Sequence, residues 1–407
     1  MLLRTLHKLT AVLAVAGTAH AYKQLAPEEL QHLLSDGYSS AARQNFDPKN
    51  TTGLLAPILR VRLPGTKESA EVRAHFRDFF EQSPALASGP DGSSSWEVEE
   101  DNFYDTTPVP PVQGGDVNVS FTNLAAVRDP PGTRPGDVGR LTLVAHYDSK
   151  REPAGFIGAI DSAFPCALIL QVLANLDAAL TRKWQTSADG DNHIRGLQVL
   201  LLDGEEALKD WTATDSIYGA RHMARTWDEQ TGDYGVTTQR KSRLDAIDLF
   251  LLLDLLGTAA PNIPSYYKHT DWAHVHLDRL QRLIRGESTE AKSENTRDNK
   301  KNGQKKASVD KAEDGWFARP GKFFMGGKIG DDHLPFHNFG VPILHLIPVP
   351  FPHVWHTIED DADHLDMPTM VEWAQIMTVF VAEYMELSGY LVWKAGKERE
   401  KKKDQSE

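Results

Sequence analysis

GLQVLLLDGEEALKDW occupies residues 196–211 and joins a largely apolar run to a cluster of acidic side chains. The apolar run has the length and composition of a strand that is covered on both faces of a sheet. Asp203, Glu205 and Glu206 follow it directly. Because neighbouring carboxylates repel each other, their place at the end of a buried strand needs a physical reason.

The pattern of an apolar strand followed by a helix recurs on both sides of this stretch. Strands are predicted at 96–103, 140–149, 196–206, 247–257 and 341–348, and helices at 26–37, 68–83, 166–180, 216–227, 272–284 and 367–387. Such alternation predicts an α/β fold with a central mixed, mostly parallel β-sheet that is covered by helices on both faces.

Length and composition favour one large domain. The chain has 407 residues, of which 40% are hydrophobic, which is enough for a sizeable core. We expect a single α/β catalytic domain over residues 22–390, a disordered polar insertion at about 286–315 and a charged tail at 391–407. The single cysteine, Cys166, excludes an intrachain disulfide and is interpreted as a small buried hydrophobe.

The N-terminus predicts entry into the secretory pathway. Residues 1–21 contain two basic residues, then a short apolar stretch, then Ala-His-Ala. This is the pattern of a signal peptide cleaved between Ala21 and Tyr22, and an uncleaved anchor is the alternative. We expect a secreted or secretory-pathway protein with no membrane span after cleavage, and Asn50 and Asn118 as glycosylation candidates. The formal charge of −13 gives no electrostatic reason to expect nucleic-acid binding.

Polar side chains gather where the predicted apolar strands stop. In open α/β sheets, ligands bind beyond the carboxyl ends of the strands, so residues far apart in sequence should converge there. Asp161, Glu206 and His356 form a set of two carboxylates and one imidazole, which is typical of a catalytic zinc site with an open position. A metal charge would make clustered carboxylates tolerable, and would leave Glu205 free as a general base.

His146 and Asp148 leave two interpretations open. They could bind a second metal ion, or they could form hydrogen bonds around the first.

Several blocks of the sequence resemble the glutaminyl-peptide cyclotransferases, or glutaminyl cyclases. The blocks follow the order found in that family and cover roughly residues 96–390; they read HYDSK, DSAFPCA, DGEEALKDW, DSIYGARHMA, LLDLLGTAAPN, DDHLPFHNFGVPILHLIP and PFPHVWHTIEDD. The resemblance implies the conversion of N-terminal glutamine to pyroglutamate with release of ammonia. Peptides and proteins with N-terminal glutamine are the implied substrates, with N-terminal glutamate as a further candidate, and we expect a monomer.

The resemblance also assigns roles to individual residues. It implies one zinc ion per chain, held by Asp161, Glu206 and His356, with Glu205 as the general acid and base. Asp254 and Asp331 correspond to an acidic hydrogen-bonded pair near the reacting amide. The wall of the substrate pocket corresponds to Trp211, His345, Phe351 and Trp355.

Two departures from the family and two other functions remain. Secreted animal members carry a cysteine where this chain has Ala145, and tend to carry a glutamine where it has Gly330. The related zinc aminopeptidases of the M28 type bind two metals, and every side chain they would need is present, so a secreted di-zinc aminopeptidase is the alternative. A catalytically silent binding protein is the third candidate, although no predicted metal ligand is substituted.

Overall fold

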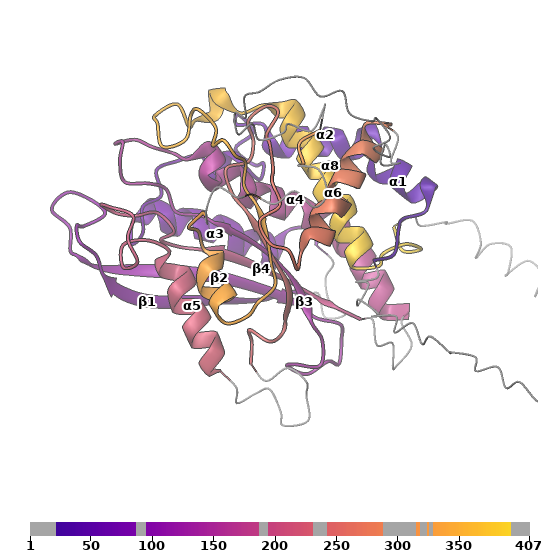
Figure 1. Ribbon diagram of the computed structural model, residues 1–407, viewed down its shortest axis with the longest axis horizontal. Helices are drawn as coiled ribbons and strands as arrows, with labels where there is room; N and C mark the ends of the chain where they lie inside the picture. Colours follow the sequence, from indigo (N-terminus) through magenta and orange to yellow (C-terminus); the bar gives the residue numbers. More distant parts are fainter. Residues whose placement is uncertain are drawn as a thin grey trace, which may run out of the picture.

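The computed structural model describes residues 22–86, 95–186, 194–230, 242–287, 315–317, 324 and 329–391 (Figure 1). The predicted signal peptide, the charged tail beyond residue 391 and residues 288–314 of the predicted insertion lie outside the described residues. Expectations about these segments therefore stay predictions.

A six-stranded sheet forms the centre of the molecule. The strands are β1 (Glu97–Thr106), β2 (Asn118–Arg128), β3 (Arg140–His146), β4 (Gly196–Leu202), β5 (Ile247–Leu253) and β6 (Ile343–Leu346). Their order across the sheet is β1-β2-β4-β3-β5-β6. β1 and β2 are antiparallel to each other, β2 is antiparallel to β4, and the remaining pairs are parallel. The prediction of a mixed, mostly parallel sheet is confirmed.

Helices cover both faces of the sheet. Successive side chains of each strand point to opposite sides, so each strand contributes to a core on either face. Leu143 of β3 joins the larger hydrophobic core and its neighbour Val144 joins the smaller one. The larger core is completed by helices on one face: α1 (Pro27–Leu33), α2 (Asp36–Phe46), α3 (Lys67–Gln82), α4 (Phe164–Thr186), α6 (Asp271–Ile284) and α8 (Met367–Tyr384). The smaller core is completed by α5 (Tyr218–Glu229) and α7 (His333–Asn338).

Strand β2 was not predicted from the sequence, because its buried side chains are partly polar. Asn123 is fully buried, where it accepts a hydrogen bond from the backbone N–H of Asp203 and donates to Asp101 and to the carbonyl of Gly219. Satisfied hydrogen bonds let the amide replace an apolar side chain in the core, which hides the strand pattern. Helix α7 was also missed, because six residues are too few to show a helical period.

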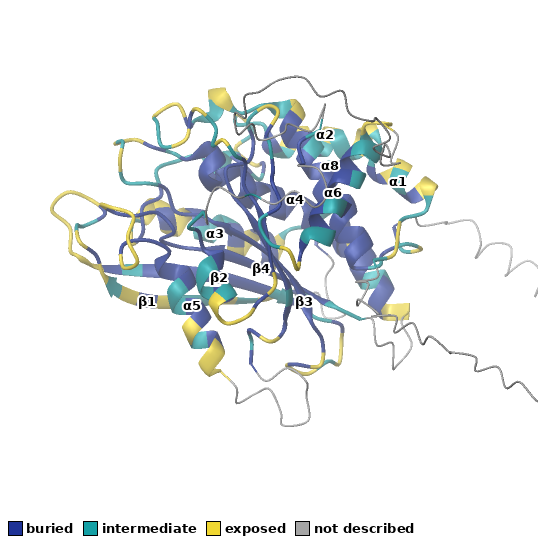
Figure 2. Cartoon of the chain, in the orientation of Figure 1, coloured by how far each residue is buried: buried dark blue, intermediate teal, exposed yellow. Residues whose placement is uncertain are grey.

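The segment Ala159–Thr186, which includes α4, is long and apolar enough to cross a membrane by length and composition. In this fold 83% of its most apolar window is buried against the protein. Figure 2 shows α4 as a buried element beside the sheet. Its apolar composition is therefore explained by its place in the larger core.

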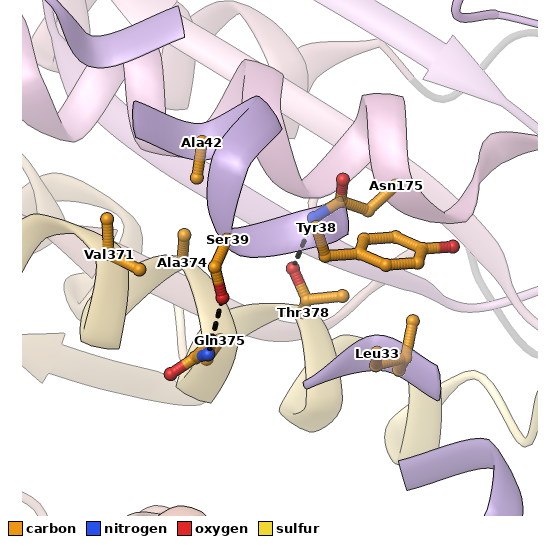
Figure 3. A pocket seen from close by; sticks show the side chains of 9 residues that line it. All are labelled: Leu33, Tyr38, Ser39, Ala42, Asn175, Val371, Ala374, Gln375 and Thr378. Atoms are coloured by element: carbon orange, nitrogen blue, oxygen red, sulfur yellow. Dashed lines mark hydrogen bonds between the residues drawn. The ribbon is translucent and has the colours of Figure 1, made fainter. Parts of the chain in front are cut away.

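A small cavity lies within the helical layer of α1, α2, α4 and α8 (Figure 3). Hydrogen bonds between Gln375 and Ser39 (3.1 Å) and between Asn175 and Thr378 (2.9 Å) cross its wall. With a volume of about 10 Å³ it has room for one water molecule at most. None of its lining residues belongs to the predicted site, so it has no part in the chemistry discussed below.

Candidate active site

The predicted site residues meet at the carboxyl edge of the parallel strands. β3 ends at His146, the chain beyond β4 carries Glu205 and Glu206, and Asp254 directly follows β5. These four side chains are all buried, with exposures between 1% and 7%. The parallel pairing of β4, β3 and β5 is what brings the ends of these strands to one edge.

Asp161, Glu206 and His356 lie close enough to bind one metal ion. One ligand atom of each lies within 4.8 Å of the others. Nε2 of His356 is 3.5 Å from Oδ2 of Asp161 and 3.4 Å from Oε1 of Glu206. Oε1 of Glu206 is buried and has no hydrogen-bond partner among the described residues. The structure thus brings together the three residues predicted as ligands.

The electrostatics of this group favour a bound cation. Burial raises the pKa of Asp161 to about 7, and the charge of Glu206 acts in the same direction. Burial also acts to raise the pKa of Glu206, but the nearby imidazole of His356 and the charge of Lys150 hold it below its usual value. Two adjacent buried carboxylates are costly unless a positive charge is near. The donor set and the orphaned Glu206 oxygen therefore fit zinc.

Glu205 lies beside the ligand group but outside it. It belongs to none of the three possible metal-binding groups found in the described part of the chain. Burial raises its pKa well above the usual value, and the charges of Asp331 and Glu206 add to this, although His146 opposes it. A raised carboxyl pKa is what a group needs in order to take up and return a proton near neutral pH.

Asp148 fixes the backbone that carries the two glutamates. Its Oδ1 accepts a hydrogen bond from the N–H of Glu205 (3.0 Å), and its Oδ2 accepts one from the N–H of Glu206 (3.2 Å). Of the two interpretations left open for Asp148, the structure therefore supports hydrogen bonding around the site. Both carboxylate oxygens are occupied by backbone donors, which orients the ligand loop.

His146 forms a second possible metal-binding group with Asp161 and Asp254. Its Nε2 is 3.0 Å from Oδ1 of Asp161 and 3.5 Å from Oδ1 of Asp254. Ser162 also donates a short hydrogen bond to Oδ1 of Asp254. Asp161 is common to both groups, as it would be in a two-metal site. The structure is therefore compatible with both interpretations of His146, as a ligand of a second metal ion or as a hydrogen-bonding partner around the first.

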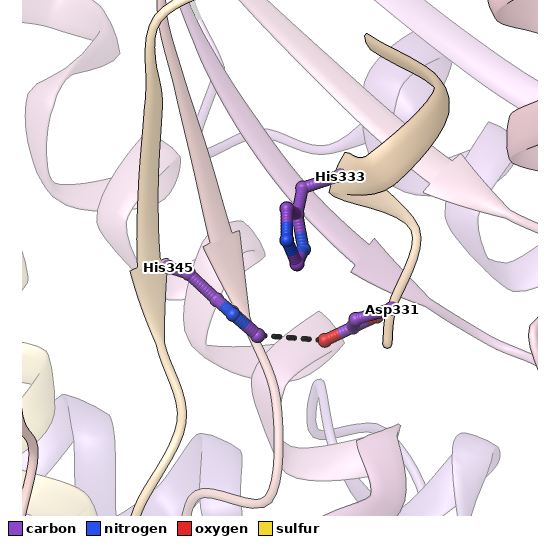
Figure 4. A group of neighbouring side chains, drawn as sticks. All are labelled: Asp331, His333 and His345. Atoms are coloured by element: carbon purple, nitrogen blue, oxygen red, sulfur yellow. Dashed lines mark hydrogen bonds and ion pairs between the residues drawn. The ribbon is translucent and has the colours of Figure 1, made fainter. Parts of the chain in front are cut away.

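Asp331, His333 and His345 form a third possible metal-binding group (Figure 4). His345 of β6 contacts Oδ2 of Asp331 through its Nε2 at 2.7 Å, and the ring of His333 from α7 lies 4.5 Å from that of His345. Burial raises the pKa of Asp331, and the charge of Asp254 adds to this. The predicted acidic hydrogen-bonded pair stays a prediction, because no hydrogen bond joins Asp254 to Asp331 among the described residues. His345 is buried against Asp331, and its role in a pocket wall stays a prediction.

The predicted aromatic wall includes a stack of rings beside His356. The ring of Trp355 stacks on His356 with centroids 3.9 Å apart, and the ring of Phe351 meets Trp355 edge-on at 4.7 Å. Trp211 lies against Gly330, where an added Cβ would be 3.1 Å from its Nε1. Trp211 and Trp355 are both exposed, at 46% and 37%. Gly330 has no side chain, which lets the indole of Trp211 approach the backbone.

We expect Gly204→Ala to lower the free energy of unfolding by at least about 2 kcal/mol. Gly204 has φ +71°, and a Cβ there would lie 2.5 Å from the ring of Phe121. Gly132→Ala is the matched control, because Gly132 has φ +82° with nothing within 4 Å and should cost only the backbone term of about 1 kcal/mol. Urea unfolding measures both, and equal losses would show that contact with Phe121 is unimportant.

Sequence reasoning missed two buried residues that surround the site. Arg62, from the segment before α3, donates to backbone carbonyls of the chain that leads to Asp161. Asp360, four residues after His356, accepts from the N–H of Ile160. Their partners are backbone atoms of segments far away in sequence, so residue type and spacing carried no signal for either.

Cys166 is buried and free, as the sequence predicted. Its thiol donates to the carbonyl of His146 at 3.2 Å, and burial raises its pKa to about 12. The thiol is therefore unreactive in the folded chain.

Comparison with known proteins supports the resemblance seen in the sequence. The chain matches Peptidase family M28 over residues 124–381. It is 38% identical over 347 residues to a glutaminyl-peptide cyclotransferase-like protein of Mus musculus, covering 84% of this chain and 77% of that protein. It is 31% identical over 395 residues to the glutaminyl-peptide cyclotransferase of Bos taurus, covering 94% of this chain and 97% of that protein.

A solved structure gives the same result for the fold. Glutaminyl cyclase of Macrostomum lignano superposes with a TM-score of 0.65 and 28% identity, covering 90% of this chain and 95% of that one. The matches cover most of the chain, and they agree with the sheet order and with the acidic and histidine side chains at the strand ends. The chain therefore belongs to the glutaminyl-peptide cyclotransferase family, within peptidase family M28.

Proposed function

We propose that this chain is a zinc-dependent glutaminyl-peptide cyclotransferase that acts on peptides and proteins with N-terminal glutamine. One observation carries the proposal. Glu205 is buried directly beside the group formed by Asp161, Glu206 and His356 and contributes no atom to it. A buried carboxyl with a raised pKa is thereby left available for proton transfer next to a three-ligand metal site.

The reaction is an intramolecular acyl transfer. The α-amine nitrogen of the terminal glutamine bonds to the carbon of its own γ-carboxamide, and the bond from that carbon to the amide nitrogen breaks. The proton lost by the amine moves to the leaving nitrogen, so the products are a pyroglutamyl peptide and ammonia. Because both reacting groups belong to one residue, the protein mainly has to hold that residue in its cyclising conformation.

The residues of this chain divide the task between them. Glu205 takes the proton from the attacking amine and returns it to the leaving nitrogen, a transfer that contributes about 10²–10⁴-fold. Asp148 keeps Glu205 and Glu206 in place through their N–H groups. Asp161, Glu206 and His356 would hold the zinc ion, which supplies Lewis-acid polarisation of the γ-carbonyl oxygen when bound.

The second candidate function is that of a di-zinc aminopeptidase. The group of His146, Asp161 and Asp254 favours it, because these side chains could hold a second ion next to the first. Peptide hydrolysis needs an activated water, whereas cyclisation uses the substrate amine as the nucleophile. An activated water is therefore needed only in the hydrolytic reaction, and a second metal ion would help to supply it.

We expect one zinc ion per chain at saturation. A glutaminyl amide of a fluorophore should be cyclised, which a coupled assay of the pyroglutamyl product or of ammonia detects. No fluorophore should be released from the corresponding leucyl amide. Elemental analysis of the dialysed protein gives the metal count, and the two amides are assayed on the same sample. Two zinc ions per chain together with release from the leucyl amide would reject the cyclotransferase and leave the aminopeptidase. One zinc ion with neither activity would favour the silent binding protein.

A further inference from the structure

Arg62 is a fully buried arginine whose side chain binds the backbone of the metal-ligand loop. Its exposure is 0%, and it comes from the segment just before α3. The guanidinium donates short hydrogen bonds to the carbonyls of Tyr147 and Ile157. It also donates to the carbonyls of Gly158 (3.0 Å) and Asp161 (3.3 Å). One side chain thus holds both ends of the chain segment that runs from β3 to Asp161.

The bonding of Arg62 suits placement of a backbone better than pairing of charges. Among the described residues it forms no ion pair, and its compensating charges come from Asp148, Asp161 and Asp360 nearby. A guanidinium has five N–H donors in a rigid plane, and can bind several carbonyls at once in a fixed geometry. Burying the charge of a guanidinium is unfavourable, and the hydrogen bonds to carbonyls together with the nearby carboxylates offset this effect.

Asp360 holds the same loop through a second set of hydrogen bonds. Its Oδ1 accepts a hydrogen bond from the N–H of Ile160 (2.8 Å), and its carbonyl accepts one from the N–H of Ala159 (3.2 Å). Asp360 lies four residues after His356, at the end of the same short turn. It therefore connects the segment that carries one predicted ligand to the segment that carries another.

The loop between these two anchors is tightly folded. Gly158 has φ +48°, and a Cβ there would lie 2.0 Å from the carbonyl oxygen of Asp161. That contact is impossible for any side chain, so Gly158 and Asp161 approach each other through backbone alone. A loop this compact has little freedom once Arg62 and Asp360 hold it, and the Asp161 carboxylate is directed toward Glu206 and His356.

We infer that Arg62 and Asp360 are positioning residues that preorganise Asp161 for metal binding, an inference that rests on the proposed zinc site. Arg62 lies outside residues 124–381, the part that matches Peptidase family M28. The segment before that region therefore contributes to the metal site through Arg62. Partners that orient a metal ligand typically change metal affinity by about 10–100-fold when they are removed.

The test uses zinc-loaded full-length protein and competition with a chelator of known zinc affinity. Arg62→Lys keeps the charge but replaces the planar fork by three donors on a flexible stem. We expect it to retain zinc about 10–100-fold less tightly. The matched control is Arg128→Lys, because Arg128 is also buried (3% exposed) but binds Asp177 and Thr181 between β2 and α4. It should lower the melting temperature and leave zinc retention unchanged.

Asp360 provides an independent pair of variants in case Arg62→Lys does not fold. Asp360→Ala removes the acceptor for the N–H of Ile160 and should weaken zinc retention in the same range. Asp360→Asn keeps a carbonyl oxygen at that position and should restore most of it. Zinc retention equal to the unaltered protein in both Arg62→Lys and Asp360→Ala would overturn the inference, even if both melt at lower temperature.

Reference samples separate this inference from the proposed function. The unaltered protein should hold zinc, and Asp161→Asn should lose it. If the unaltered protein holds no zinc, the proposed metal site fails and the positioning inference fails with it. If only Asp161→Asn loses zinc while the Arg62 and Asp360 variants retain it, the metal site stands and the positioning inference alone is rejected.

Discussion

Replacement of Glu205 by glutamine is expected to lower kcat for cyclisation of a glutaminyl peptide by about 10²–10⁴-fold. Glutamine has nearly the same shape but cannot accept the proton of the attacking amine. The backbone at this position is held by Asp148, so the substitution should not displace the neighbouring residue Glu206, a proposed metal ligand. Zinc content and melting temperature should therefore stay close to those of the unaltered protein.

Asp210→Asn is the control for this experiment. Asp210 is an exposed carboxylate on the same loop, and the same change from acid to amide there should leave kcat unchanged. Steady-state kinetics and elemental analysis are measured on all three proteins. If Glu205→Gln instead loses zinc, Glu205 is a ligand and the roles of the two glutamates must be exchanged. If it keeps full activity, the proposed proton transfer is wrong.

Replacement of His356 by asparagine is expected to remove zinc and, with it, almost all cyclisation activity. The backbone of His356 has φ +56°, a conformation that asparagine tolerates better than most residues, so the substitution tests the imidazole rather than the backbone. Loss of Lewis-acid stabilisation of the oxyanion is worth several kcal/mol, which corresponds to a decrease in kcat/KM of about 10³-fold or more.

The matched control is His353→Asn, because His353 is an exposed histidine three residues earlier in the same segment. It should retain both zinc and activity. Dialysis against a chelator followed by elemental analysis measures retained metal, and addition of zinc to the dialysed samples should restore activity to the control alone. Full zinc retention by His356→Asn would exclude His356 as a ligand and reject the proposed set of three.

The parallel part of the fold could be predicted from sequence because burial on both faces leaves a direct record in composition. β3, β4, β5 and β6 are nearly continuous apolar runs, and each appeared where it was expected. Their ends fixed the edge at which Asp161, Glu206 and His356 would meet. β2 could not be predicted in the same way, since Asn123 is buried by hydrogen bonds rather than by apolar contact.

The residues around the proposed metal site were harder to predict than the proposed ligands themselves. A metal ligand must be one of a few residue types, and those types at strand ends stand out in the sequence. Arg62 and Asp360 act on backbone carbonyls and N–H groups, which every residue has, so their partners leave no pattern. The proton affinity of Glu205 likewise depends on burial and on Asp331, which is distant in sequence.

The state of Cys166 has a consequence for the conditions under which this protein can fold. Its thiol is enclosed beside the carbonyl of His146, and it is the only sulfhydryl group in the sequence. No disulfide has to be formed or rearranged on the way to the native state. Folding of this sequence therefore does not depend on oxidising enzymes or on the thiol–disulfide potential of the compartment. The absence of a disulfide therefore sets no requirement on the redox state of the compartment in which this sequence folds.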